Sequence, residues 1–268
     1  MKTALFIAAS TVLLILACAG IATPGQPFTA TPPLPITVMA AASLSEAFQE
    51  LGSQFEAQHP GVRLEFNFAG SQQLAQQLAQ GAAADVFASA DQEQMDVAVQ
   101  AGRVGDGSAR IFAHNQLAVI YPANNPAGLL ELPDLARPGL KLVLAASEVP
   151  AGRYSLQMLE KASLDPAFPP SYKQDVLKNV VSYESNVKAV LTKVALGEAD
   201  AGIVYISDAY DQVGQLPIPA ALNVTASYPI AALQDSPQSG LAQAFVDLVL
   251  SPEGQQVLVK YGFIPLIH

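Results

Sequence analysis

The sequence predicts an α/β protein in which short apolar strands alternate with amphipathic helices. Two observations indicate this class. Apolar positions change repeatedly from the two-residue period of a strand to the 3.6-residue period of a helix, and Pro or Gly residues separate the segments. In addition, 51% of the 268 residues are hydrophobic, which is enough for a substantial core in one or two domains. Repeated strand–helix units form mainly parallel sheets, and their ligands bind beyond the carboxyl ends of the strands.

The first third of the predicted body shows this alternation most clearly. Residues 36–40 form a short apolar strand, after which Ser43 is expected to cap a helix over 44–59 that stops at Pro60-Gly61. A strand over 62–68 follows, with apolar side chains at every second position. The Gln-rich segment 72–80 has Leu at helical spacing, so we predict an amphipathic helix there, followed by a strand over 86–89 and a helix over 92–101.

The same pattern continues to the end of the chain. Further strands are predicted over 116–121, 142–145, 180–183 and 201–204. Further helices are predicted over 152–162, 187–196, 238–250 and 252–261.

The first 35 residues do not fit this pattern. Lys2 and the apolar run over 4–17 are typical of an export signal and too short for a comfortable membrane span. The run ends in ILAC (15–18), which resembles a lipobox, so we predict a signal peptide over 1–18 and lipid attachment at Cys18, the single cysteine. The alternative is an ordinary signal cleaved after Ala19 or Ala22. Residues 19–35 are uncharged and rich in Pro, Thr, Ala and Gly, and are expected to form a flexible linker.

The charge balance excludes some partners. The formal net charge is −10, and it becomes −11 when the signal with Lys2 is left out. Nucleic acid is therefore not an expected partner, and an anion could bind only at a site whose local groups attract it despite the net negative charge. His59, His114 and His268 are scattered and have no cysteine partner, so no metal site is predicted.

Two predicted turns could form such a local anion-binding site. AASL (41–44) and AGSQ (69–72) each place a serine between a strand and a helix. The start of a helix presents unpaired N–H groups and a partial positive charge, so it binds anions without Lys or Arg. A serine before a helix is more often a simple N-cap, however, and the turns alone do not decide between the two readings.

Longer segments carry a family resemblance. They are ITVMAAASLSEAF (36–48), FAGSQQLAQQLAQGAAADVFASAD (68–91), EVPAGRYSLQML (148–159), YESNVKAVLTKVALGEADAGIVYISDA (183–209) and KYGF (260–263). From residue 36 to the C-terminus, the sequence resembles the molybdate-binding proteins of ABC transporters.

This resemblance implies a two-domain type II periplasmic-binding-protein fold with the ligand in the cleft between the domains. Domain 1 would combine 36–113 with 228–268, and domain 2 would cover 114–227. The protein would be a non-enzymatic, lipid-anchored carrier at the outer face of the cytoplasmic membrane or in the periplasm. It would be a monomer without cofactor that delivers molybdate or tungstate to an ABC permease. The ligand-binding residues implied are Ser43, Ser71, Ala151, Val187 and Tyr205.

Some residues depart from the family pattern or suggest other roles. Gly70 stands where relatives often have a hydroxyl residue, and Arg153 stands where an apolar residue is common, so it either points into solvent or attracts the anion at long range. We expect capping and domain-contact roles for Asp85 and Asp91. The remaining alternatives are a carrier of another oxyanion such as sulfate, and an exported α/β hydrolase that uses Ser43 or Ser71 as its nucleophile, although no candidate histidine lies in a matching segment.

Overall fold

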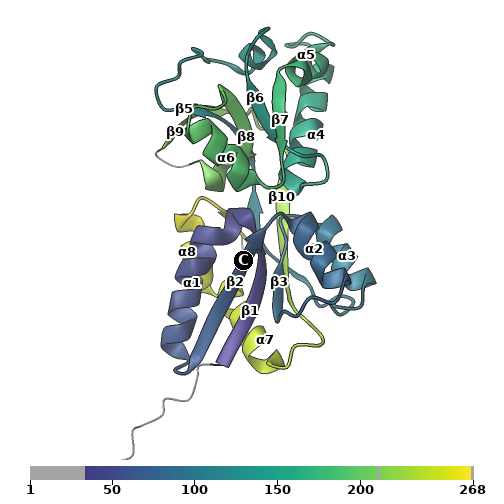
Figure 1. The fold of residues 1–268 in the computed structure, drawn as a ribbon, viewed down its shortest axis with the longest axis vertical. Coiled ribbons are helices and arrows are strands. Elements are labelled where there is room, and N and C mark those ends of the chain that lie inside the picture. The colour runs from purple at the N-terminus through teal and green to yellow at the C-terminus, as the bar shows by residue number, and fades with distance from the viewer. Residues whose placement is uncertain (1–33, 210–211, 267–268) are drawn as a thin grey trace, which may run out of the picture. The chain divides into compact units, whose positions relative to one another are not determined.

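The computed structural model describes residues 34–209 and 212–266, which build two sheets flanked by helices (Figure 1). The predicted signal peptide, the linker and Cys18 lie outside the described residues. The first sheet has six strands in the order β11-β4-β10-β3-β1-β2. Their bounds are β1 (Leu34–Ala41), β2 (Val62–Ala69), β3 (Val86–Ala88), β4 (Arg110–Asn115), β10 (Ala226–Ala232) and β11 (Ile264–Pro265).

The second sheet has five strands in the order β7-β6-β8-β5-β9. They are β5 (Leu117–Pro122), β6 (Leu142–Ala145), β7 (Val180–Glu184), β8 (Ala201–Tyr205) and β9 (Val213–Pro217). The chain passes from the first sheet to the second at Gln116, between β4 and β5, and returns between β9 and β10. We call each sheet with its helices a lobe, and the exact domain boundaries stay a prediction.

Helices cover both faces of the first sheet (Figure 1). Val38 of β1 belongs to one hydrophobic cluster and its neighbour Met39 to another, because successive side chains of a strand point to opposite faces. Phe48 and Phe245 pack edge to face in the first cluster, with ring centroids 5.7 Å apart. The helices of this lobe are α1 (Ser45–Gln58), α2 (Ser71–Ala79), α3 (Gln92–Gln100), α7 (Ser239–Leu250) and α8 (Pro252–Lys260), together with the short 3₁₀-helix η1 (Ala42–Leu44).

The second lobe contains the helices α4 (Pro150–Leu164), α5 (Tyr172–Lys178) and α6 (Val187–Ala195), and the 3₁₀-helices η2 (Leu132–Ala136) and η3 (Ile206–Asp208). Residues 163–178 form the end of α4, a turn and α5. The buried Tyr172 anchors α5 by donating a hydrogen bond to the carbonyl oxygen of Leu132, at 2.5 Å. The role of this segment in the fold is thus structural. None of the helices in the described ranges is both long and apolar enough to cross a membrane.

The fold class is as predicted, but the sheets are mixed rather than mainly parallel. Every parallel pairing joins strands connected through helices, namely β1 with β2 and β3, and β6 with β7 and β8. Strands β4, β5, β9, β10 and β11 pair antiparallel. These strands surround the two passages between the lobes, where no helical crossover forces the next strand into a parallel direction.

Candidate functional site

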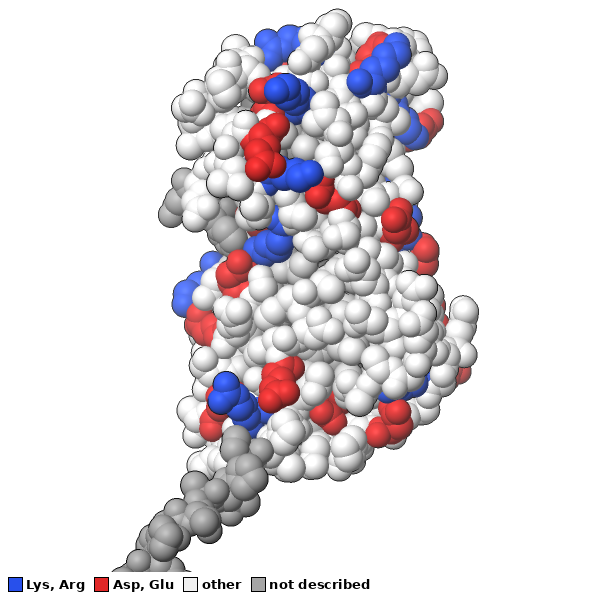
Figure 2. Space-filling view, in the orientation of Figure 1, with Lys and Arg blue, Asp and Glu red and all other residues white. Residues whose placement is uncertain are grey.

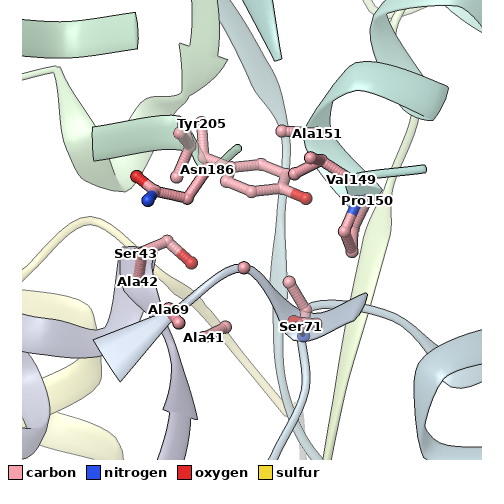
Figure 3. A pocket seen from close by; sticks show the side chains of 13 residues that line it. Ala41, Ala42, Ser43, Ala69, Ser71, Val149, Pro150, Ala151, Asn186 and Tyr205 are labelled. Carbon is pink, nitrogen blue, oxygen red and sulfur yellow. Dashed lines mark hydrogen bonds between the residues drawn. The ribbon is translucent and has the colours of Figure 1, made fainter. Parts of the chain in front are cut away.

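A small cavity lies between the two lobes, at the carboxyl ends of strands from both sheets. Its cavity volume is about 10 Å³, far below the roughly 300–1,000 Å³ typical of pockets for organic ligands, so it leaves room only for a very small ligand. Figure 3 shows Ser43 and Ser71 on one side and Ala151, Asn186 and Tyr205 on the other. The described residues that line it are Ala41, Ala42, Ser43, Ala69, Gly70, Ser71, Ala90, Val149, Pro150, Ala151, Asn186, Val187 and Tyr205, and none of these carries a charge.

Four helix starts meet at this cavity. The short η1 contributes Ser43, and α2 begins at Ser71. From the second lobe, α4 contributes Ala151 in its first turn and α6 begins at Val187. The N–H groups of a first turn have no partner within their helix, and the aligned peptide dipoles make this end partly positive. The cavity is therefore lined with donors although it lacks Lys and Arg.

The structure shows that neither serine is a simple N-cap. Ser43, expected to cap the first helix, lies inside η1, and its hydroxyl is 2.9 Å from the hydroxyl of Tyr228. At α2 the N-cap residue is Gly70, and the Ser71 hydroxyl accepts a hydrogen bond from the N–H of Ala90 at 3.0 Å. Because that oxygen is used as an acceptor, the Ser71 proton remains available for a group in the cavity.

Tyr205 supplies the most informative group in the cavity. It ends β8 with 1% of its surface exposed, and its hydroxyl has no hydrogen-bond partner among the residues described. Burial raises the pKa of this phenol well above its ordinary value, with nearby Tyr and Asp groups acting in the same direction. The group therefore stays protonated. Buried polar groups normally have a partner, so an orphan donor aimed at a cavity indicates a ligand.

The nearby charges are paired outside the cavity lining. Arg153 contacts Asp91 and Glu93, and thus it neither points into solvent nor faces the cavity. Asp91 also caps α3 by accepting from the N–H of Gln94, so the expected capping and contact roles are both present. Burial raises the pKa of Asp91 despite that hydrogen bond and the adjacent guanidinium.

A second pairing involves Lys188, the residue after Val187. Its ammonium lies 2.9 Å from Glu46 and 3.0 Å from Asp208. Asp208 is fully buried, and burial raises its pKa to about 6 although Lys188 acts against the shift. Figure 2 shows acidic and basic groups lying next to each other on the face in view, without an extended basic patch.

Three further observations bear on the alternatives. Asp85 accepts hydrogen bonds from the N–H of Thr37 and the hydroxyl of Ser236, which both belong to the first lobe, so the capping and domain-contact roles expected for Asp85 were wrong. None of the cavity-lining residues described is a histidine or carboxylate that could activate either serine. Within the described parts of the chain, no group of three His, Cys, Asp or Glu side chains could hold a metal ion.

Two residues, one in this site and one next to it, were not found from the sequence. Asn186 is the N-cap of α6, and its side chain accepts from the N–H of Ala189 at 3.0 Å. An Asn directly before the predicted helix could have indicated this role. Tyr228 contacts Ser43 across 185 positions of the chain, and no local sequence signal connects these two residues.

Comparison with known proteins places the chain in a family. Residues 36–264 match the family described as bacterial extracellular solute-binding protein. The chain belongs to this family. A relative of this solute-binding protein is the molybdate-binding protein ModA of Mycobacterium tuberculosis, which is 42% identical over 231 residues that cover 85% of this chain and 84% of the relative.

Two other matches agree with this family. The putative ABC transporter substrate-binding lipoprotein YvgL of Bacillus subtilis is 30% identical over 266 residues, 98% of each chain. The structure of the periplasmic molybdate-binding protein of Azotobacter vinelandii shares the fold, with a TM-score of 0.75 at 19% identity, over 87% of this chain and all of the other. The predicted family and fold are thereby confirmed, and the five residues expected to bind the ligand all line one cavity of this solute-binding protein.

Proposed function

We propose that this solute-binding protein captures molybdate or tungstate outside the cytoplasm and delivers it to an ABC importer. The observation that carries the proposal is the buried hydroxyl of Tyr205, a protonated donor without a partner among the described residues, in a cavity lined by helix starts. The names of relatives such as the ModA of Mycobacterium tuberculosis support the choice of ligand.

The proposed ligand set consists of neutral donors. Ser43, Ser71 and Tyr205 would donate through their hydroxyls, and Ala151 and Val187 through backbone N–H groups. Hydrogen bonds to an ionised acceptor are stronger than neutral ones, and exclusion of water strengthens them further. A site without a carboxylate acceptor suits a fully deprotonated dianion, whereas phosphate at neutral pH carries a proton that needs an acceptor.

Capture would proceed by closure of the two lobes. Ser43 and Ser71 belong to the first lobe and the other three residues to the second, so only the closed arrangement satisfies all oxygens of the anion. In this proposal the lobes are the domains 36–113 with 228–268, and 114–227. The carrier acts as a monomer without cofactor or enzymatic activity, and lipid on Cys18 keeps it near its permease.

Isothermal titration of the exported, processed protein with molybdate, tungstate, sulfate and phosphate tests this proposal. We expect one-to-one binding of molybdate and tungstate, and no heat with phosphate. Binding of sulfate in preference to molybdate would support the other oxyanion carrier. Silence toward all four anions would refute the oxyanion site.

A further inference from the structure

Tyr228 lies directly behind the cavity but does not line it. It is on β10, the strand by which the chain returns to the first lobe, and no part of its surface is exposed. The rings of Phe112, Tyr205 and Phe263 pack edge-on against it, with centroids 6.2, 5.8 and 5.4 Å away. Because three aromatic rings surround it, the position of its hydroxyl is fixed.

Either hydroxyl could donate in the hydrogen bond between Tyr228 and Ser43, and the surroundings favour Tyr228 as the donor. A buried tyrosine proton requires an acceptor, and the Ser43 hydroxyl oxygen is 2.9 Å away. Both ends of the neighbouring Asn115 amide are engaged, since it donates to Ser207 at 2.8 Å and accepts from the N–H of Gln116 at 2.9 Å. The Tyr205 hydroxyl is not within hydrogen-bonding geometry of any described residue, so it does not take the Tyr228 proton. Burial raises the pKa of Tyr228 well above its ordinary value, so the phenol retains the proton that it donates.

We propose that Tyr228 is a positioning residue that donates its hydroxyl proton to Ser43 and thereby directs the single Ser43 proton into the cavity. A serine hydroxyl has one proton. If Ser43 donated to Tyr228, it would present only lone pairs to the cavity and would repel an anion. With Tyr228 as donor, Ser43 becomes a preorganised donor, and successive hydrogen bonds polarise one another. This inference rests on the proposed function and names a residue outside the ligand-contacting set.

The test is a double-mutant cycle with sodium molybdate as the probe. Tyr228→Phe removes one neutral hydrogen bond and is expected to raise the Kd by about 3- to 10-fold. In a Ser43→Ala background the same substitution is expected to leave the Kd unchanged, because the proton that Tyr228 directs is absent. A structural role would instead weaken binding equally in both backgrounds, and that result would overturn the proposal.

A second measurement retains the shape of Tyr228 and tests the direction of the bond. Incorporation of a ring-monofluorinated tyrosine at position 228 makes the phenol a stronger donor and a weaker acceptor. Binding of molybdate should become tighter if Tyr228 donates to Ser43, and weaker binding would overturn the proposal even if Tyr228→Phe fails to fold. A wild-type protein that binds no oxyanion would refute the proposed function itself. Normal wild-type binding with unaltered variants would refute only the role of Tyr228.

Discussion

Removal of the Tyr205 hydroxyl should separate ligand affinity from stability. Tyr205→Phe retains the buried ring and deletes a donor that has no partner among the described residues. A hydrogen bond to a charged acceptor contributes about 1.5–3 kcal/mol, so we expect the Kd for molybdate to rise by about 10- to 150-fold. The unliganded protein should not lose stability, because an unpaired buried polar group costs about 1–3 kcal/mol and the substitution removes it.

Tyr172→Phe is the matched control. Tyr172 is as buried as Tyr205, at 1% exposure, and belongs to the same lobe, but its hydroxyl donates to a carbonyl oxygen. Its loss removes this buried hydrogen bond, so stability should fall by about 0.5–1.5 kcal/mol while affinity is unchanged. Urea unfolding without ligand and isothermal titration measure the two quantities. The reasoning is refuted if Tyr205→Phe behaves like the control, because its hydroxyl would then have a partner within the protein.

Three other predictions follow from the geometry. A Cβ on Gly152 would lie 2.0 Å from a backbone carbonyl oxygen, so Gly152→Ala must displace the start of α4 and raise the Kd for molybdate in isothermal titration. The control is Gly240→Ala, which should leave this Kd unchanged because nothing lies within 4 Å of the added Cβ. Arg153→Met leaves the buried Asp91 without its cation and should lower the free energy of unfolding, measured in urea, by about 1–3 kcal/mol. A further Asp91→Asn substitution should partly restore this stability, and an unchanged unfolding midpoint of Arg153→Met would contradict the prediction. Asp208 has its pKa raised from 3.8 to about 6, so the folded state binds its proton more tightly and this residue's contribution to stability decreases as pH rises from about 4 to 6. Relative to Asp208→Asn, the wild type should lose about 2 kcal/mol between pH 4 and 7 in urea unfolding, and parallel pH curves for the two proteins would contradict the assignment.

The two serine turns of the first lobe could be located from the sequence, although it did not decide between anion binding and N-capping. A strand, a tight turn and a helix follow one another within a few residues at Ser43 and Ser71, and parallel strands bring such turns to one edge of a sheet. Such local patterns can be recognised in a sequence because the spacing of the apolar residues changes at the turn itself. The assignment of the second lobe's residues depended on the family resemblance.

The parts that sequence reasoning missed depend on contacts between distant segments. The hydrogen bond of Tyr228 to Ser43 and the pairing of Arg153 with Asp91 link positions 185 and 62 residues apart. Of the antiparallel strands around the two passages, β5 was predicted, but β4, β9, β10 and β11 were missed. Strands β4 and β10 pair with each other across more than a hundred residues. Such pairings are selected by the packed fold and have no periodic signal in either segment.

The charge distribution explains how an acidic protein can offer a site for a dianion. Arg153 stands two positions after Ala151, and Lys188 stands one position after Val187. Their charges are paired with Asp91 and Glu46 of the opposite lobe, and neither side chain lines the cavity. The contacts that join the lobes therefore also remove free cations from the neighbourhood of the site. Attraction for the anion then depends on oriented hydroxyl and N–H donors, which act only at short range and in fixed directions. An arrangement of this kind discriminates among anions by protonation state and size rather than by charge alone, and it requires that donors such as Ser43 be oriented from behind.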